Sequence, residues 1–159
     1  MARRLPRNPE ASSPAVQAVM RANRAKDTTP ELVVRALLRE QGFTGYRLHW
    51  KTSAGRVDIA FVGRKVAIAV HGCFWHRCPK CSRPLPQRNQ NFWKAKFQAN
   101  KTRDRKMAST LSSLGWRQKV IWECQTRDPL FTLPIKLKHW LTEYNGTRRT
   151  KKHSIVPDG

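Results

Sequence analysis

The chain has 159 residues, and 32 Lys and Arg side chains against 10 Asp and Glu give it a formal net charge of +22. This length fits one domain with a single core. So much positive charge destabilises a compact fold unless a polyanion offsets it, so nucleic acid is the expected partner. No apolar run approaches the roughly 20 residues of a spanning helix, and no signal-peptide segment follows Met1. We therefore expect a soluble, cytoplasmic protein and exclude a membrane-embedded one.

The two ends of the chain differ in composition from its middle. Residues 1–12 are rich in Arg and Pro without an apolar period, and residues 147–159 are basic, so we expect both to be disordered. Residues 13–146 should form the single domain. Its first helix is expected to begin near Ser13 and to carry Arg21 and Arg24. For the second we expect Thr29 as N-cap, a stop at Gly42 and an apolar face of Val33, Ala36 and Leu37.

Strand patterns follow. Tyr46, Leu48 and Trp50 alternate with polar residues, which predicts a half-buried strand. The apolar runs 57–62 and 66–70, separated by Gly63 and Arg64, predict a hairpin buried on both faces, with Asp58 inside it.

The second half of the chain returns to helical periodicity. A long basic helix is predicted from Asn91 to Leu114, then a strand from Trp116 to Trp122. A last helix should span Pro134 to Tyr144 and bury Ile135, Leu137 and Leu141.

Four cysteines form the densest chemical motif. Cys73, Cys78 and Cys81 follow a C-x4-C-x2-C spacing, and Cys124 ends a later strand. Without export the thiols stay reduced, so a metal site is favoured over disulfides. Four thiolates make a closed tetrahedral site typical of structural zinc, which would tie the segment after residue 70 to the strand ending at Cys124. The alternative is a set of buried free thiols that pack as small hydrophobes.

Three motifs carry a family resemblance. His-Gly-Cys-Phe-Trp-His at 71–76, Gly-Arg-x-Asp at 55–58 and Ile-Trp-Glu-Cys at 121–124 resemble the very short patch repair endonucleases, in the same order along residues 13–126. The resemblance implies an α/β fold with a restriction-endonuclease-like three-layer core, in which helices flank a central mixed sheet, and a structural zinc. It also implies Mg²⁺-dependent nicking on the 5′ side of the mismatched thymine in T·G pairs.

The resemblance also implies catalytic roles. A carboxylate inside an apolar strand needs a partner or a cation, and Asp58 has either Arg56 or a divalent ion to meet that need. In the family the matching residue binds Mg²⁺, together with the backbone carbonyl that corresponds to Val70. Glu31 matches an outer-sphere carboxylate, although a first-turn Glu also suits the helix dipole.

The same comparison assigns proton transfer and phosphate contact to histidines. His76 is expected to pair with Asp104 and to act as acid or base, and His71 should lie beside Asp58 and contact the scissile phosphate or its water.

Aromatic and basic residues complete the expected site. Phe74, Trp75 and Trp93 should form a wedge that enters the mismatched step, with ordinary core packing as the alternative. Trp50, Trp116, Trp122 and Trp140 are assigned to the core by default. Phosphate contacts are expected from a group of side chains on the long helix: Lys94, Lys96, Lys101, Arg103, Arg105 and Lys106. By resemblance, Arg21 and Arg24 reach the minor groove.

Two other functions fit part of this pattern. Charge and a four-cysteine site alone would suit a non-catalytic zinc-bearing nucleic-acid module, but a buried Asp58 beside His71 argues against it. The chain could also make double-strand breaks in restriction or defence. We expect a nucleoid-associated bacterial monomer that acts on T·G-mismatched duplex DNA, alongside mismatch-repair proteins and a cytosine-5 methyltransferase.

Overall fold

The computed structural model describes residues 14, 17, 26–53, 55–128 and 132–146. The expected first helix, with Arg21 and Arg24, and the two expected disordered ends lie outside these residues. Strands β1 (Arg47–Thr52), β2 (Gly55–Phe61) and β3 (Val66–His71) pair antiparallel in sequence order. Strand β4 (Arg117–Trp122) joins β3 in parallel, so the sheet is mixed, in the order β1-β2-β3-β4. No described helix is long and apolar enough to cross a membrane.

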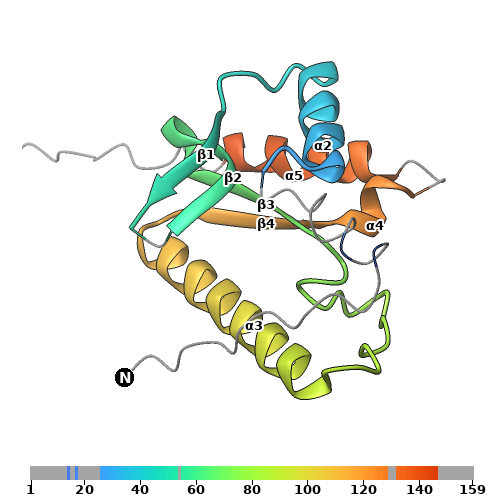
Figure 1. Ribbon diagram of the computed structural model, residues 1–159. Coiled ribbons are helices and arrows are strands. Elements are labelled where there is room, and N and C mark those ends of the chain that lie inside the picture. Colours follow the sequence, from blue (N-terminus) through green and yellow to red (C-terminus); the bar gives the residue numbers. More distant parts are fainter. Residues whose placement is uncertain (1–13, 15–16, 18–25, 54, 129–131, 147–159) are drawn as a thin grey trace, which may run out of the picture.

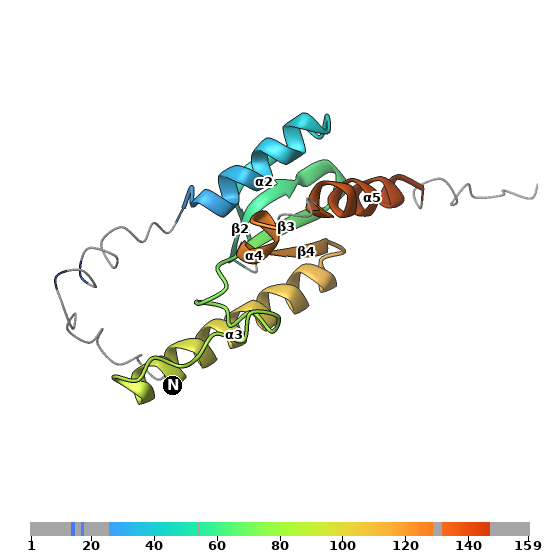
Figure 2. The same ribbon diagram turned by 90° about the vertical axis from the view of Figure 1, so that its right-hand side faces the viewer.

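Helices cover both faces of this sheet. Helices α2 (Thr29–Glu40) and α5 (Thr132–Gly146) lie on one face, and the long helix α3 (Gln90–Ser113) lies on the other (Figures 1 and 2). A 3₁₀ turn, η1 (Val62–Arg64), joins β2 to β3, and the four-residue helix α4 (Glu123–Thr126) follows β4. The structure thus confirms the expected mixed sheet between helices.

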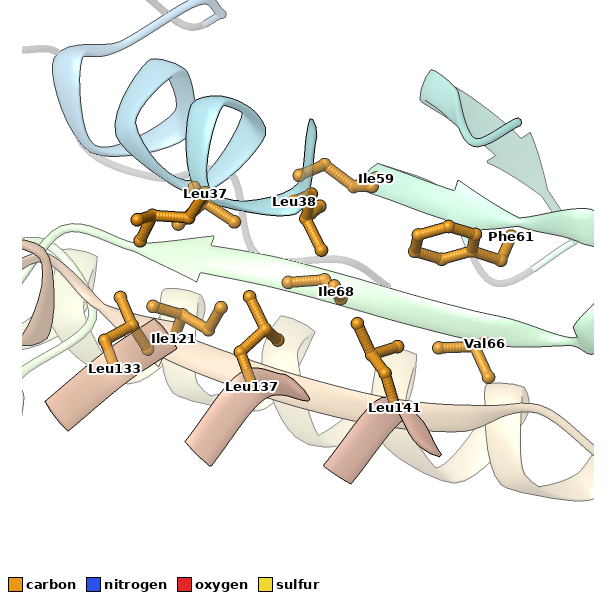
Figure 3. Close-up of a cluster of buried hydrophobic side chains, with 11 residues drawn as sticks. Leu37, Leu38, Ile59, Phe61, Val66, Ile68, Ile121, Leu133, Leu137 and Leu141 are labelled. Carbon is orange, nitrogen blue, oxygen red and sulfur yellow. The ribbon is translucent and has the colours of Figure 1, made fainter. Parts of the chain in front are cut away.

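Two apolar clusters hold the three layers together. The larger one packs side chains of α2 and α5 onto β2, β3 and β4, as Figure 3 shows for Leu38, Ile68 and Leu137. The smaller one packs Leu111 of α3 against Val57, Ala60 and Ala67 on the opposite face. Strand β3 is therefore buried on both faces, as its uninterrupted apolar run predicts.

The structure corrects several local predictions. The N-cap of α2 is Thr28 rather than Thr29, and the helix buries Val34, Leu37 and Leu38, whereas Ala36 is exposed. The expected turn at Gly63 and Arg64 is extended by Lys65, whose φ of 51° lies in the left-handed region. Trp50 was expected in the core but lies on edge strand β1 and is 37% exposed.

Helix α5 gives the clearest test of the core. Leu137 is 1% exposed, whereas Ile135, which the sequence pattern also placed on the buried face, is 74% exposed. Leu137→Ala should lower the free energy of unfolding by roughly 2–5 kcal/mol, because it removes buried methyl groups and leaves a cavity. Ile135→Ala on the same helix should change it by less than about 0.5 kcal/mol. Denaturant unfolding measures both, and equal losses would contradict this packing.

Candidate active site

Asp58 lies in β2 between buried Val57 and Ile59, and its Oδ2 accepts a hydrogen bond from the Val70 backbone N–H at 2.7 Å. Burial raises the pKa of Asp58, the nearby Glu31 carboxylate raises it further, and the Val70 bond opposes both effects. Arg56, the alternative partner considered above, is exposed and is not the group that this carboxylate bonds. A half-buried carboxylate with a raised pKa is a group that a divalent cation would stabilise.

Two histidines and a second carboxylate lie at the end of β3. His76 Nδ1 and Asp104 Oδ2 are 2.6 Å apart, which confirms the expected pair. The His71 ring stacks on His76, with centroids 4.0 Å apart, and meets Trp122 edge to face. Burial and the adjacent His76 lower the pKa of His71 to about 4, so this imidazole is neutral at pH 7. His71 and Asp58 line one cavity, although the ring contacts of His71 are with His76 and Trp122.

The segment between β3 and α3 carries the aromatic residues. Phe74 makes edge-to-face contacts with Trp75, Trp93 and Phe97, and Trp93 stacks on Phe97. Phe97 is buried, whereas Phe74, Trp75 and Trp93 are half-buried, so the cluster has a solvent-facing side. Both ribbon views show the segment running alongside α3 (Figures 1 and 2).

Asn100 was not anticipated from the sequence. It is buried on α3, and its side-chain amide donates to the Trp75 backbone oxygen at 2.8 Å. It thereby fixes the backbone of the residue that precedes His76. Its position three residues after Phe97, on the apolar side of a basic helix, is the signal that could have identified it.

The four cysteines converge as expected. The sulfur atoms of Cys73, Cys78, Cys81 and Cys124 lie within 4.8 Å of one another, and the sulfurs of Cys78 and Cys124 are 3.9 Å apart. Sulfurs around a tetrahedral ion with bonds of about 2.3 Å lie about 3.8 Å apart, so the donor set fits such an ion. Burial and the three neighbouring thiols raise the pKa of Cys124 to about 12, so a cation is needed to favour its thiolate.

The start of α2 brings further charged groups to the site. Glu31 is 4% exposed; its Oε1 accepts from the Thr28 hydroxyl, and its Oε2 accepts from the Asp27 N–H and from Arg35. The residue is therefore held by specific hydrogen bonds, beyond what a helix dipole alone requires. Arg35 and His49, which contact each other here, were missed from the sequence. The i,i+4 spacing of Glu31 and Arg35 was a usable signal.

One cavity of about 1220 Å³ is lined by Glu31, Asp58, His71, His76 and Asp104. Besides the acidic and histidine side chains, Lys96, Arg103, Arg56 and Arg127 line it. Lys94, Lys101, Arg105 and Lys106 are exposed on α3 and do not line this cavity. With 3.6 residues per turn, Lys96, Asn100 and Arg103 share one side of the helix, whereas Lys94, Lys101 and Arg105 share another. The six basic residues predicted to contact phosphate therefore form at least two groups.

The cavity combines a half-buried carboxylate within strand β2, an imidazole paired with a second carboxylate, and cationic side chains. Such groups can bind a phosphodiester, neutralise its charge and move a proton.

Comparison with known proteins gives the family. The profile of the DNA mismatch endonuclease Vsr matches residues 13–83. The type II nicking enzyme V.XorIIP of Xanthomonas oryzae pv. oryzae is 38% identical over 123 residues, which cover 77% of this chain and 89% of that protein. The DNA mismatch endonuclease Vsr of Escherichia coli is 36% identical over 108 residues, 68% of this chain and 69% of that protein. The chain belongs to the Vsr family of DNA endonucleases.

A solved structure, the catalytic domain of the homing endonuclease I-Bth0305I, is also similar. It is 25% identical, the match covers 78% of this chain and all of that domain, and the TM-score is 0.48.

Proposed function

We propose that this endonuclease nicks duplex DNA on the 5′ side of the mismatched thymine in T·G pairs, in a reaction that depends on Mg²⁺. The observation that carries the proposal is the half-buried Asp58 carboxylate in β2, which lines the same cavity as the His76–Asp104 pair. The names of its relatives, a DNA mismatch endonuclease and a nicking enzyme, support both the mismatch and the single-strand cut. We further propose a restriction-endonuclease-like core, a monomeric enzyme, and a cytosine-5 methyltransferase and mismatch-repair proteins as partners in its pathway.

Asp58 and the Val70 backbone carbonyl would hold Mg²⁺. When bound, this ion activates water and neutralises charge on the scissile phosphate. The Val70 N–H fixes the orientation of the Asp58 carboxylate, because it holds Oδ2. Glu31, which its hydrogen bonds hold near Asp58, would be the outer-sphere carboxylate of this site.

His76 would move a proton. A carboxylate accepts hydrogen bonds, so the bond to Asp104 places the His76 proton on Nδ1 and leaves Nε2 to exchange a proton with the substrate. The neutral His71 stacked on this ring can orient the phosphate or its water without repelling a protonated His76. Lys96 and Arg103, which line the same cavity, would contact DNA phosphates, and we propose the same role for Lys94, Lys101 and Arg105 on the outer face of α3.

Phe74, Trp75 and Trp93 would form the wedge. Their mutual ring contacts and the Asn100 bond to Trp75 make the group rigid, so it need not be ordered on binding. Inserting side chains costs a few kcal/mol of unstacking per step, and a mismatched step costs less, which gives selectivity.

The first prediction concerns Asp58. Asp58→Asn should reduce nicking of a T·G duplex by more than about a hundredfold, beyond the 10–100-fold typical of an outer-shell partner of a metal, because a ligand is lost. DNA affinity should persist, since the cationic side chains are unchanged. Single-turnover nicking and gel-shift binding measure the two effects. Glu143→Gln, an exposed carboxylate on α5, serves as control. Near-normal nicking by Asp58→Asn would show that the metal is held elsewhere.

A second prediction concerns zinc. Protein purified without added metal should contain one zinc ion per chain, which Cys81→Ser removes and the neighbouring Ser82→Ala retains. Removing the ion should unfold the domain, because closed zinc sites contribute on the order of 10 kcal/mol to small modules. Elemental analysis and thermal unfolding test this. Four freely titrating thiols in the folded protein would contradict the site.

The wedge is tested by Trp75→Ala. Loss of roughly 1–3 kcal/mol of base stacking should weaken binding to a T·G duplex more than to a paired duplex, with the salt dependence unchanged. Trp50→Ala, which replaces an exposed tryptophan on β1, is the matched control. It should change neither the preference for the T·G duplex nor the salt dependence of binding. Equal losses on both duplexes together with a lower unfolding temperature would assign Trp75 to the core instead.

A further inference from the structure

Arg35 is a buried cation whose partners are all potential metal ligands. The residue is 4% exposed. Its Nη1 lies 2.6 Å from Asp27 Oδ1, and its Nη2 lies 3.0 Å from Glu31 Oε2 and 3.3 Å from His49 Nε2. The ligand atoms of Asp27, Glu31 and His49 lie within 4.8 Å of one another. Two carboxylate oxygens and an imidazole nitrogen at that spacing suit a divalent ion such as Mn²⁺.

His49 places one ring nitrogen between the cation and a carboxylate of this cluster. Its Nε2 lies 3.3 Å from Arg35 Nη2 and 3.4 Å from Asp27 Oδ1. An imidazole nitrogen at this position is also the group that a neutral histidine offers a metal.

The backbone at His49 supports this arrangement. His49 lies in β1 between Leu48 and Trp50, which pair with Ile59 and Val57 on either side of Asp58. Its φ of 49° is in the left-handed region, which costs a non-glycine residue free energy and persists only where other contacts impose it. Here the ring is directed to Arg35 and Asp27. The strand therefore departs from regular geometry at the residue that completes the cluster.

We infer that the Arg35 guanidinium occupies a second cation position, formed by Asp27, Glu31 and His49, and so prevents a divalent ion from binding there. That one ion remains, bound at Asp58, rests on the proposed function. That Arg35 fills the second position does not. A covalently attached cation neutralises Glu31 at any metal concentration. It also holds Glu31 near Asp58 without a ligand that can dissociate.

Mn²⁺ binding to the zinc-loaded protein without DNA tests the inference, because Mn²⁺ prefers oxygen and nitrogen ligands to the cysteine sulfurs. Electron paramagnetic resonance of free Mn²⁺ gives the stoichiometry. The wild type and Arg35→Lys should bind one ion. Arg35→Met should bind one more ion than the wild type, and His49→Ala in that background should abolish the gain. Added Mn²⁺ should also raise the unfolding temperature of Arg35→Met more than that of the wild type.

Each outcome has a clear meaning. A folded Arg35→Met with no extra ion, or a wild type with two ions of which His49→Ala removes one, overturns the inference. If Arg35→Met and Arg35→Ala are unfolded without metal, refolding by Mn²⁺ supports the inference, and failure to refold at any Mn²⁺ concentration overturns it. A wild type that binds no Mn²⁺ contradicts the proposed metal at Asp58 alone, because the gain of one ion on removing the guanidinium is measured separately.

Discussion

The hydrogen bond from the Val70 N–H to Asp58 is the interaction around which this site is built. It joins adjacent strands through a side chain and places an anionic group inside a sheet whose neighbouring side chains are apolar. Burial opposes that charge and the bond favours it, so the carboxylate gains from any further cation in the cavity. The charged residues at the start of α2 line the same cavity as His71, at the end of β3, and His76. A sheet that apolar packing stabilises therefore also carries a cluster of charged and polar groups.

The segment after His71 has no regular structure of its own and depends on its neighbours. Cys73 donates its N–H to Glu123 and accepts one from Cys124, which ties the segment to the end of β4. On the other side, Asn100 and Asp104 of α3 bind Trp75 and His76. Helix α3 therefore supports the segment between β3 and α3 and also supplies positive charge. This double anchoring explains how one short segment can present aromatic rings and an imidazole in a fixed arrangement.

Periodicity predicted the elements well because burial imposes it: β2, β3, α3 and β4 were found within a few residues of their expected bounds. The cysteine cluster and the His76–Asp104 pair were also correctly anticipated, the pair through family resemblance. Hydrophobicity alone could not predict that Trp50 would be partly exposed on an edge strand, or that Ile135 would face solvent. Both depend on which other elements pack against these side chains. Arg35 and His49 could not be identified from the sequence, because they contact each other only in the folded chain. The sequence does not distinguish the lysines and arginines of α3 from one another. Only the geometry of the folded helix shows that Lys96 and Arg103 line the cavity and that the other predicted basic residues do not.

We propose that this cavity cuts one strand of mismatched DNA with the help of a divalent metal. The most direct measurement is cleavage of a set of duplexes that carry every single mismatch in several sequence contexts, with and without Mg²⁺, analysed on denaturing and native gels. We expect a single-strand nick 5′ of the thymine in T·G duplexes, seen only with Mg²⁺ and only on the denaturing gel. Cleavage of both strands of fully paired DNA, or nicking that continues in the presence of a chelator, would contradict it.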